Sequence, residues 1–146
     1  MRLRVSTDVA APVDQVYAVY ADYRRWPEIF PTIHGVRVIG RDQHSLVLAI
    51  DHDEGQVRNH LVLQPPYRVI VEENKRAYDA TFINTFRPSG AGTRFEVEGH
   101  IHLRGLRRLL VPIVRAYARR LMRRLQLAPV KAEAERRLAT DRRRQW

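Results

Sequence analysis

The sequence contains no cysteine, so it has no disulfide bonds and no metal or redox site built on thiolates. It also lacks an apolar run of signal-peptide length and any stretch near the roughly 18 apolar residues of a membrane span. The nucleotide-binding and hydrolase motifs GxGxxG, the Walker loop, GxSxG and HExxH are absent as well. These absences favour a cytoplasmic protein that is soluble or peripheral to a membrane, and they predict no cofactor.

Acidic residues are scarce only in the last third of the chain. Residues 104–146 contain 14 Lys or Arg and 3 Asp or Glu, a net charge of +11, whereas residues 1–103 contain 12 and 13, a net charge of −1. The positive excess is therefore local rather than spread over the surface. A chain of 146 residues is long enough for one core. We expect a single domain over residues 1–128 and a basic helical extension or tail over residues 129–146.

The first thirty residues predict a strand, a helix and a second short helix. A period of two over residues 3–9 indicates a half-buried strand, and helical spacing of apolar residues follows from Pro12. Pro27 should push Trp26 out of helical geometry and begin a second helix, which Pro31 ends. We therefore expect a sharp corner at Trp26-Pro27.

Residues 36–103 predict about six more strands in an antiparallel meander, because no helical period interrupts them. A two-residue turn at Glu54-Gly55 would make Asp53 face Gln56 and fix the register of one hairpin. Alternation predicts the inward side chains of the last two strands, namely Tyr78, Ala80, Phe82, Asn84, Phe86, Phe95, Val97, Gly99 and Ile101.

A helical period returns between Gly105 and Ala128 and predicts a long amphipathic helix. Pro112 should kink this helix or mark its start, and Pro129 should end or bend it. The expected apolar face consists of Leu106, Leu109, Leu110, Ile113, Tyr117 and Leu121. Arg108, Arg115, Arg119 and Arg123 lie opposite that face on a helical wheel.

The segment AAPVDQVYAVYADYRRWPEIFPTI resembles the opening of the START-like superfamily SRPBCC, in particular its polyketide cyclase/dehydrase and coenzyme Q-binding branch. The shared features are Ala-Pro, a valine-rich helix, an Asp, and Trp-Pro followed by a second proline, all within residues 10–31. The resemblance implies an α+β helix-grip fold. In that fold a curved antiparallel sheet of about seven strands wraps a long C-terminal helix, and two short helices follow the first strand. It also implies a cavity between sheet and helix, with the short helices across its mouth.

Polar side chains on the expected inner face are candidates for contacts with a ligand. Asn59 and Asn84 are the strongest, because a buried amide without a partner costs about 1–3 kcal/mol; His52 and Tyr78 also point inward. The alternative is that the amides bond to the backbone or to each other, and that Trp26 merely fills the core. The expected ligand-binding set is Trp26, Phe30, Asn59, Tyr78, Phe82, Asn84, Phe95, Ile113, Tyr117, Arg120 and Arg124. Only Asn59, Tyr78 and Asn84 are candidates for catalysis.

Two groups of charged or titratable side chains could be functional, but each could also simply be solvated surface. Arg120 and Arg124 fall beside the apolar face of the last helix, where they either extend outward to solvent or bind an acidic group in the cavity. His100 and His102 share a face, but it is the outer one, so we predict a solvated stripe and no metal site.

Three functions fit these features. The first is binding or transport of a hydrophobic small molecule such as a polyketide, quinone or lipid, and we favour it. The second is a polyketide aromatase/cyclase, so whether the protein is an enzyme is left open. Relatives of that kind carry an inward arginine after the first long hairpin, whereas Arg58 should point outward here. The third is contact of the basic C-terminal segment with an anionic membrane. Nucleic acid is disfavoured because Tyr117 and Trp146 are the only aromatics among the arginines. The oligomeric state is not predicted.

Overall fold

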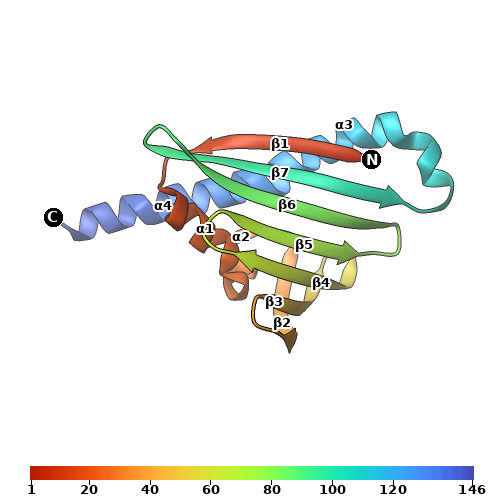
Figure 1. Cartoon of the computed structure of the whole chain (residues 1–146), viewed down its shortest axis with the longest axis horizontal. Helices are drawn as coiled ribbons and strands as arrows, with labels where there is room; N and C mark the ends of the chain where they lie inside the picture. Colours follow the sequence, from red (N-terminus) through yellow and green to blue (C-terminus); the bar gives the residue numbers. More distant parts are fainter.

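Seven antiparallel β-strands make up most of the chain, which a computed structural model describes over all residues 1–146. They form one sheet in the order β1-β7-β6-β5-β4-β3-β2. The strands are β1 (Arg2–Val9), β2 (Ile33–Arg41), β3 (Ser45–His52), β4 (Gly55–Gln64), β5 (Arg68–Asn74), β6 (Tyr78–Ser89) and β7 (Gly92–Leu103). Figure 1 shows that the sheet is curved and that the C-terminal helices run across one of its faces. This is the expected helix-grip fold.

The helices occupy the start and the end of the chain. Two of them, with a short 3-10 turn between, connect β1 to β2, and a nearly continuous helical segment follows β7. These elements are α1 (Val13–Ala21), η1 (Tyr23–Arg25), α2 (Trp26–Ile29), η2 (Gly105–Leu110), α3 (Val111–Met122), η3 (Arg123–Leu127) and α4 (Ala128–Arg144). None of the helices combines the length and the apolar character needed to cross a lipid bilayer.

Alternation along the strands decides which side chains enter the core. The predicted inward residues of β6 and β7 face the helices, and Phe86, Phe95 and Val97 are completely buried. Gly99 on β7 has a packing role, since a Cβ there would lie 3.3 Å from the Phe82 ring and 3.4 Å from the Met122 methyl group. The absent side chain thus lets the helix approach the sheet.

The predicted register of the β3–β4 hairpin is wrong by two residues. Asp53 and Glu54 form the turn, and His52 pairs with Gly55 rather than Asp53 with Gln56. Gly55 has φ of +106°, a left-handed conformation that glycine adopts directly after such a turn, so it begins β4 instead of lying within the turn. A shift of two preserves the face of every side chain, so the predicted inner and outer faces are correct.

The corner between the first two helices was predicted at Trp26-Pro27, but it lies four residues earlier, at Asp22. Trp26 has helical angles and is the first residue of α2, and the chain leaves helical geometry at Asp22, with φ of −80° and ψ of 68°. Pro27 occupies the first turn of α2, where its missing N–H has no helical partner to lose. The indole of Trp26 folds back and donates a hydrogen bond of 2.8 Å to the Tyr20 carbonyl.

The C-terminal helix bends where proline requires it. Pro112 begins α3, as one of the two alternatives predicted. Ahead of Pro129 the helix widens into the π-turn η3, in which the Ala128 N–H bonds to the Arg123 carbonyl five residues back. Beyond it, α4 continues through the expected boundary at residue 128 and packs against α1 and β1, burying Val130 and Ala134. Residues 129–144 are thus helical and contribute to the core.

The predicted apolar face of the long helix is wrong. Val114, Ala118 and Met122 face the sheet instead, at the four-residue spacing of one helical side. The predicted residues Leu106, Leu109, Leu110, Ile113 and Tyr117 are exposed. The apolar stripe of α3 is wider than the surface that the sheet offers it, and the sheet covers only one edge of that stripe.

Candidate functional site

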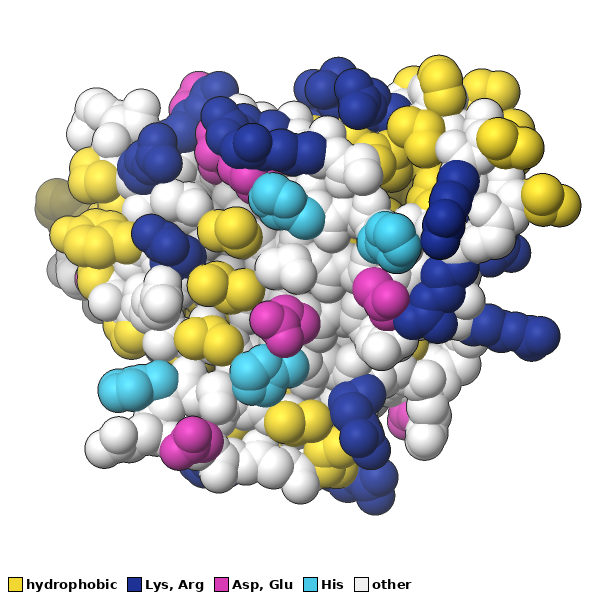
Figure 2. All heavy atoms as spheres, turned by 45° about the vertical axis from the view of Figure 1, so that its right-hand side comes forward, with side chains coloured by type: hydrophobic (Ala, Val, Ile, Leu, Met, Phe, Trp, Pro, Cys, Tyr) yellow, Lys and Arg dark blue, Asp and Glu magenta, His cyan; other side chains and the backbone are white.

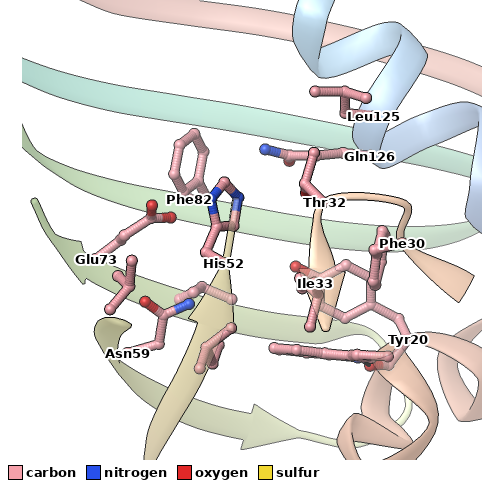
Figure 3. A pocket seen from close by; sticks show the side chains of 14 residues that line it. Tyr20, Phe30, Thr32, Ile33, His52, Asn59, Glu73, Phe82, Leu125 and Gln126 are labelled. Carbon is pink, nitrogen blue, oxygen red and sulfur yellow. Dashed lines mark hydrogen bonds between the residues drawn. The ribbon is translucent and has the colours of Figure 1, made fainter. Parts of the chain in front are cut away.

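A cavity of about 140 Å³ lies between the sheet, the α1–α2 region and the π-turn η3. Most of its wall is hydrophobic, as expected for a small-molecule site. The apolar lining residues are Tyr20, Trp26, Phe30, Ile33, Ile50, Val57, Val71, Phe82 and Leu125, and the polar ones are Thr32, His52, Asn59, Glu73 and Gln126. Figure 3 shows Asn59, Glu73 and Phe82 on one side, Tyr20, Phe30 and Ile33 on the other, and Gln126 reaching in from the helix.

Strand alternation delivers the polar groups to this place. His52 ends β3, Asn59 lies on β4 and Glu73 lies on β5, each at an inward position of neighbouring strands. Asn59 and Glu73 are directly paired in the β4–β5 register. Gln126 comes from the π-turn, whose extra residue per turn redirects side chains and often marks functional sites.

Two amide groups in the cavity wall are not satisfied by the protein. The Oδ1 atom of Asn59 and the Oε1 atom of Gln126 are buried and have no hydrogen-bond partner. Buried polar atoms are nearly always paired, so each needs a donor from water or from a bound molecule. The cavity therefore combines an apolar wall with free hydrogen-bonding capacity on two sides.

His52 contributes a neutral hydrogen-bond donor. Burial and the nearby Lys75 ammonium lower the pKa of the imidazole below its ordinary value, which favours the uncharged ring. Its Nδ1 atom accepts a hydrogen bond of 3.3 Å from the Glu54 backbone N–H. The neutral ring therefore carries its proton on Nε2.

A charged cluster forms one end of the site. The Lys75 ammonium lies 2.9 Å from a Glu73 carboxylate oxygen and 3.0 Å from Glu54. Burial alone would lower the pKa of Lys75, but the Glu73 carboxylate outweighs burial and raises it. Burial, aided by the same carboxylate, raises the pKa of the Tyr78 phenol to about 12. Lys75 and Tyr78 thus stay protonated at neutral pH and hold the Glu73 carboxylate in place.

Comparison with known families decides the classification. Residues 1–135 match the model of the family described as polyketide cyclase/dehydrase and lipid transport. The chain belongs to this family. A search of curated proteins finds no match.

Several solved structures share the architecture of this family member at low sequence identity. The di-domain ARO/CYC StfQ of the steffimycin biosynthetic pathway superposes with a TM-score of 0.78 at 21% identity, covering 94% of this chain and 51% of StfQ. The Zhui aromatase/cyclase from Streptomyces sp. R1128 gives 0.78 at 19% identity, covering 94% and 95%. A START superfamily protein from Mycobacterium smegmatis gives 0.58 at 14% identity, covering 86% and 97%. The chain spans about half the length of the di-domain protein, and identities this low establish the fold alone.

Four of the residues predicted for the ligand site of this family member line the cavity: Trp26, Phe30, Asn59 and Phe82. Asn84 is fully buried outside it and donates hydrogen bonds to the Val69 carbonyl at 3.1 Å and the Phe82 carbonyl at 3.4 Å. Its amide N–H group therefore follows the alternative in which the amide bonds to the backbone, while its Oδ1 atom is buried without a partner. Phe95 is also buried away from the cavity, and Tyr78 lines an adjoining recess, from which its hydroxyl donates a hydrogen bond of 3.4 Å to Glu73.

The remaining four predicted residues lie on the surface. Ile113, Tyr117, Arg120 and Arg124 are exposed and do not line the cavity. The reason is the rotation of α3 described above, which turns Val114 and Ala118 toward the sheet in their place. Arg120 and Arg124 face solvent.

Sequence reasoning missed Glu73 and Gln126. Glu73 could have been found, because Val69 and Val71 are inward and alternation places residue 73 on the same face. Gln126 could not, because a regular helical period does not anticipate the π-turn.

Proposed function

We propose that the protein binds a hydrophobic small molecule with an aromatic ring and a hydroxyl group in this cavity. The observation that carries the proposal is the pair of unpartnered amide oxygens of Asn59 and Gln126 in an otherwise apolar wall. A hydroxyl group donates and accepts hydrogen bonds, so it satisfies a carboxamide in either orientation. The aromatic rings of Trp26, Phe30 and Phe82 offer edges and faces to a ligand ring.

The volume of the cavity limits what it encloses. A cavity of about 150 Å³ accommodates one benzene-sized molecule, and the volume here is about 140 Å³. A polyketide, quinone or lipid would place one ring or chain end inside and extend outward. An adjoining recess of about 380 Å³, which shares Val57 with the cavity, provides room for the extension.

Native mass spectrometry of purified protein tests the binding proposal. We expect an additional mass for a bound hydrophobic molecule, and its loss in Val57→Phe, which fills the junction of cavity and recess. Ile39→Phe, on an exposed position of β2, is the control and should retain the ligand. A wild-type protein that carries no added mass and takes up no aromatic compound would overturn the proposal.

A second candidate function is cyclisation of a poly-β-ketone chain, favoured by the presence of both a neutral His52 and the Glu73 carboxylate in the cavity wall. Glu73 would take a proton from a methylene between two carbonyls, and the resulting carbanion would attack a carbonyl carbon of the same chain. His52 Nε2–H would donate to that carbonyl oxygen. The alkoxide formed from the attacked carbonyl then takes up the proton that Glu73 carries. Loss of water from the resulting hydroxyl compound gives the ring double bond. Arg58 has no part in this, since it is exposed on the outer face.

Turnover of a short poly-β-ketone separates the two functions. If the protein is a cyclase, Glu73→Gln should lower kcat far more than it raises KM. The matched control is Glu72→Gln, whose side chain lies exposed on the opposite face of the same strand. Binding without turnover in the wild type would leave the binding function alone.

A further inference from the structure

Five large apolar side chains in the segment 106–117 have no cover from the rest of the protein. Single exposed apolar residues are ordinary, but a cluster indicates a contact surface. These five are among only eight such residues in the whole protein. Their exposed fractions are Leu106 84%, Leu109 79%, Leu110 50%, Ile113 72% and Tyr117 63%. We call them the apolar patch.

The charged side chains of the segment that carries the apolar patch are all basic. No Asp or Glu occurs between residues 99 and 132. Eight arginines lie between residues 104 and 124, and all but Arg104 make no ion pair. They are Arg104, Arg107, Arg108, Arg115, Arg119, Arg120, Arg123 and Arg124. Figure 2 shows a group of apolar side chains on this side of the molecule with dark blue basic side chains around it.

The position of the apolar patch suits a flat partner. Figure 1 shows η2 and the start of α3 at one end of the molecule, beyond the end of β7. A protruding turn reaches a planar surface before the rest of the protein does. The patch also extends onto one side of α3. Ile113 and Tyr117 each precede a half-buried residue, Val114 and Ala118, and one residue along a helix is a rotation of about 100°.

We propose that the apolar patch and its arginines dock the protein on an anionic lipid bilayer. Exposed leucines bury themselves at the boundary of headgroups and acyl chains, while arginines reach lipid phosphates from beside them. Charge complementarity selects this occupant, since residues 104–124 contain eight arginines and no Asp or Glu. Docking belongs to residues 104–124 and not to the basic end of α4.

Docking would also orient the ligand site, a consequence that rests on the proposed binding function. Arg107 borders the recess that contains Lys75 and Tyr78, and Val57 joins this recess to the cavity. The recess therefore lies beside the docking surface. A hydrophobic ligand would then enter or leave at the membrane.

Flotation with phosphatidylcholine vesicles, with and without phosphatidylserine, tests docking on the full chain without ligand. We expect binding only to the anionic vesicles, and weakening by added salt. Arg120→Glu/Arg124→Glu should reduce binding at least about tenfold, because these exposed side chains lie beside Ile113 and Tyr117 and each basic residue near an anionic surface contributes about fivefold. Arg142→Glu/Arg143→Glu, the same charge change at the end of α4, should leave binding within about twofold, since these side chains lie outside the docking surface.

The apolar contribution is tested with a second matched pair. Leu106→Ser/Leu109→Ser should lose most vesicle binding, whereas Ile39→Ser/Tyr67→Ser, at exposed positions elsewhere, should not. Circular dichroism checks that all variants fold. Equal loss in the α4 variant, absence of wild-type binding to anionic vesicles, or a wild-type dimer that Leu106→Ser/Leu109→Ser dissociates would each overturn the proposal. Ligand binding is measured separately, by the fluorescence of Trp26 in the cavity wall. Failure of the docking proposal therefore leaves the binding proposal intact, and the reverse also holds.

Discussion

The two ends of the sheet's inner face differ in how they are filled. At one end, Tyr17 of α1 packs edge-on against Phe86 at 5.7 Å, and Phe86 stacks on Phe95 at 4.9 Å with an interplanar angle of 6°. α4 covers β1 nearby and buries Val130. At the other end the same face surrounds the cavity with Asn59, Glu73 and His52. We call these the filled end and the hollow end.

Neighbouring residues on one strand show where the ends meet. Phe82 and Phe86 share a face of β6 four residues apart, about 13 Å along the strand. Phe86 is enclosed by aromatic rings, whereas Phe82 borders the cavity. The sheet is continuous through both positions, so the difference lies in the helices: α1 and α4 fill one end, and the π-turn supplies a polar side chain at the other. Stability should therefore reside at the filled end and binding at the hollow end.

The largest expected effect comes from Phe86→Ala. Loss of a fully buried, stacked ring should lower the free energy of unfolding by about 3–5 kcal/mol, measured by urea denaturation. Phe82→Ala should cost clearly less, because one side of that ring already lacks packing partners, and it should weaken ligand binding. Equal losses of stability would erase the distinction between the two ends.

The second effect concerns the C-terminal helix. Leu127→Ala should destabilise the protein by about 2–5 kcal/mol, because Leu127 is buried where η3 meets α4. Leu109→Ala, the same substitution on the apolar patch, should change stability by less than about 0.5 kcal/mol. If Leu127→Ala were equally neutral in urea denaturation, the helix beyond α3 would not belong to the core.

The two buried asparagines give the sharpest paired test. Asn84→Ala removes two hydrogen bonds to backbone carbonyls and should lower the free energy of unfolding by about 1–3 kcal/mol. The amide oxygens of both residues are buried without a partner, but Asn59 makes no side-chain hydrogen bond, so in Asn59→Ala stability should stay within about 1 kcal/mol of the wild type or rise. The opposite order in thermal or urea unfolding would contradict the assignment of Asn59 to the ligand.

The smallest effect is a pH dependence at the hollow end. The pKa of His52 is lowered in the folded state from about 6.5, so below pH 6.5 the unfolded chain binds more protons. Stability should therefore fall as the pH decreases from 6.5 toward the folded-state pKa. His52→Gln should flatten this slope in a series of urea titrations, whereas His102→Gln, at an exposed outer position, should not. An unchanged slope in His52→Gln would show that His52 is not buried in its neutral form.

Much of the fold could be predicted from the sequence because the strands alternate cleanly. Leu3, Val5 and Val9 of β1 and the inner residues of β6 and β7 follow a period of two, and each lies where the alternation places it. Even the two-residue error in the β3–β4 hairpin leaves every side chain on its predicted face. The motif of residues 10–31 adds the family, and with it the arrangement of sheet and helix.

The helices were less predictable because tertiary contacts decide their rotation. The apolar residues of α3 cover more than half of a helical wheel, and only the sheet determines that Val114 and Ala118 pack against the core while Ile113 and Tyr117 are exposed. Likewise, the corner at Asp22 is accompanied by a tertiary hydrogen bond from the Trp26 indole to the Tyr20 carbonyl, which local sequence patterns do not reveal. Of the site residues on strands, Asn59 and Phe82 were predicted and Glu73 was missed although alternation places it inward. Gln126 was missed because the π-turn follows no regular helical period.

The central claim is that the hollow end binds a ring that carries a hydroxyl group, and Trp26 can report on it directly. The protein has two tryptophans, and Trp146→Phe leaves only Trp26, which lines the cavity. Titration of its fluorescence with phenol and with toluene compares ligands of similar size that differ in the hydroxyl group.

We predict that phenol and toluene both perturb Trp26, and that Asn59→Ala lowers the ratio of phenol affinity to toluene affinity by about 2- to 12-fold, the value of one hydrogen bond. The absence of any response from Trp26, or a ratio unchanged by Asn59→Ala, would contradict the account.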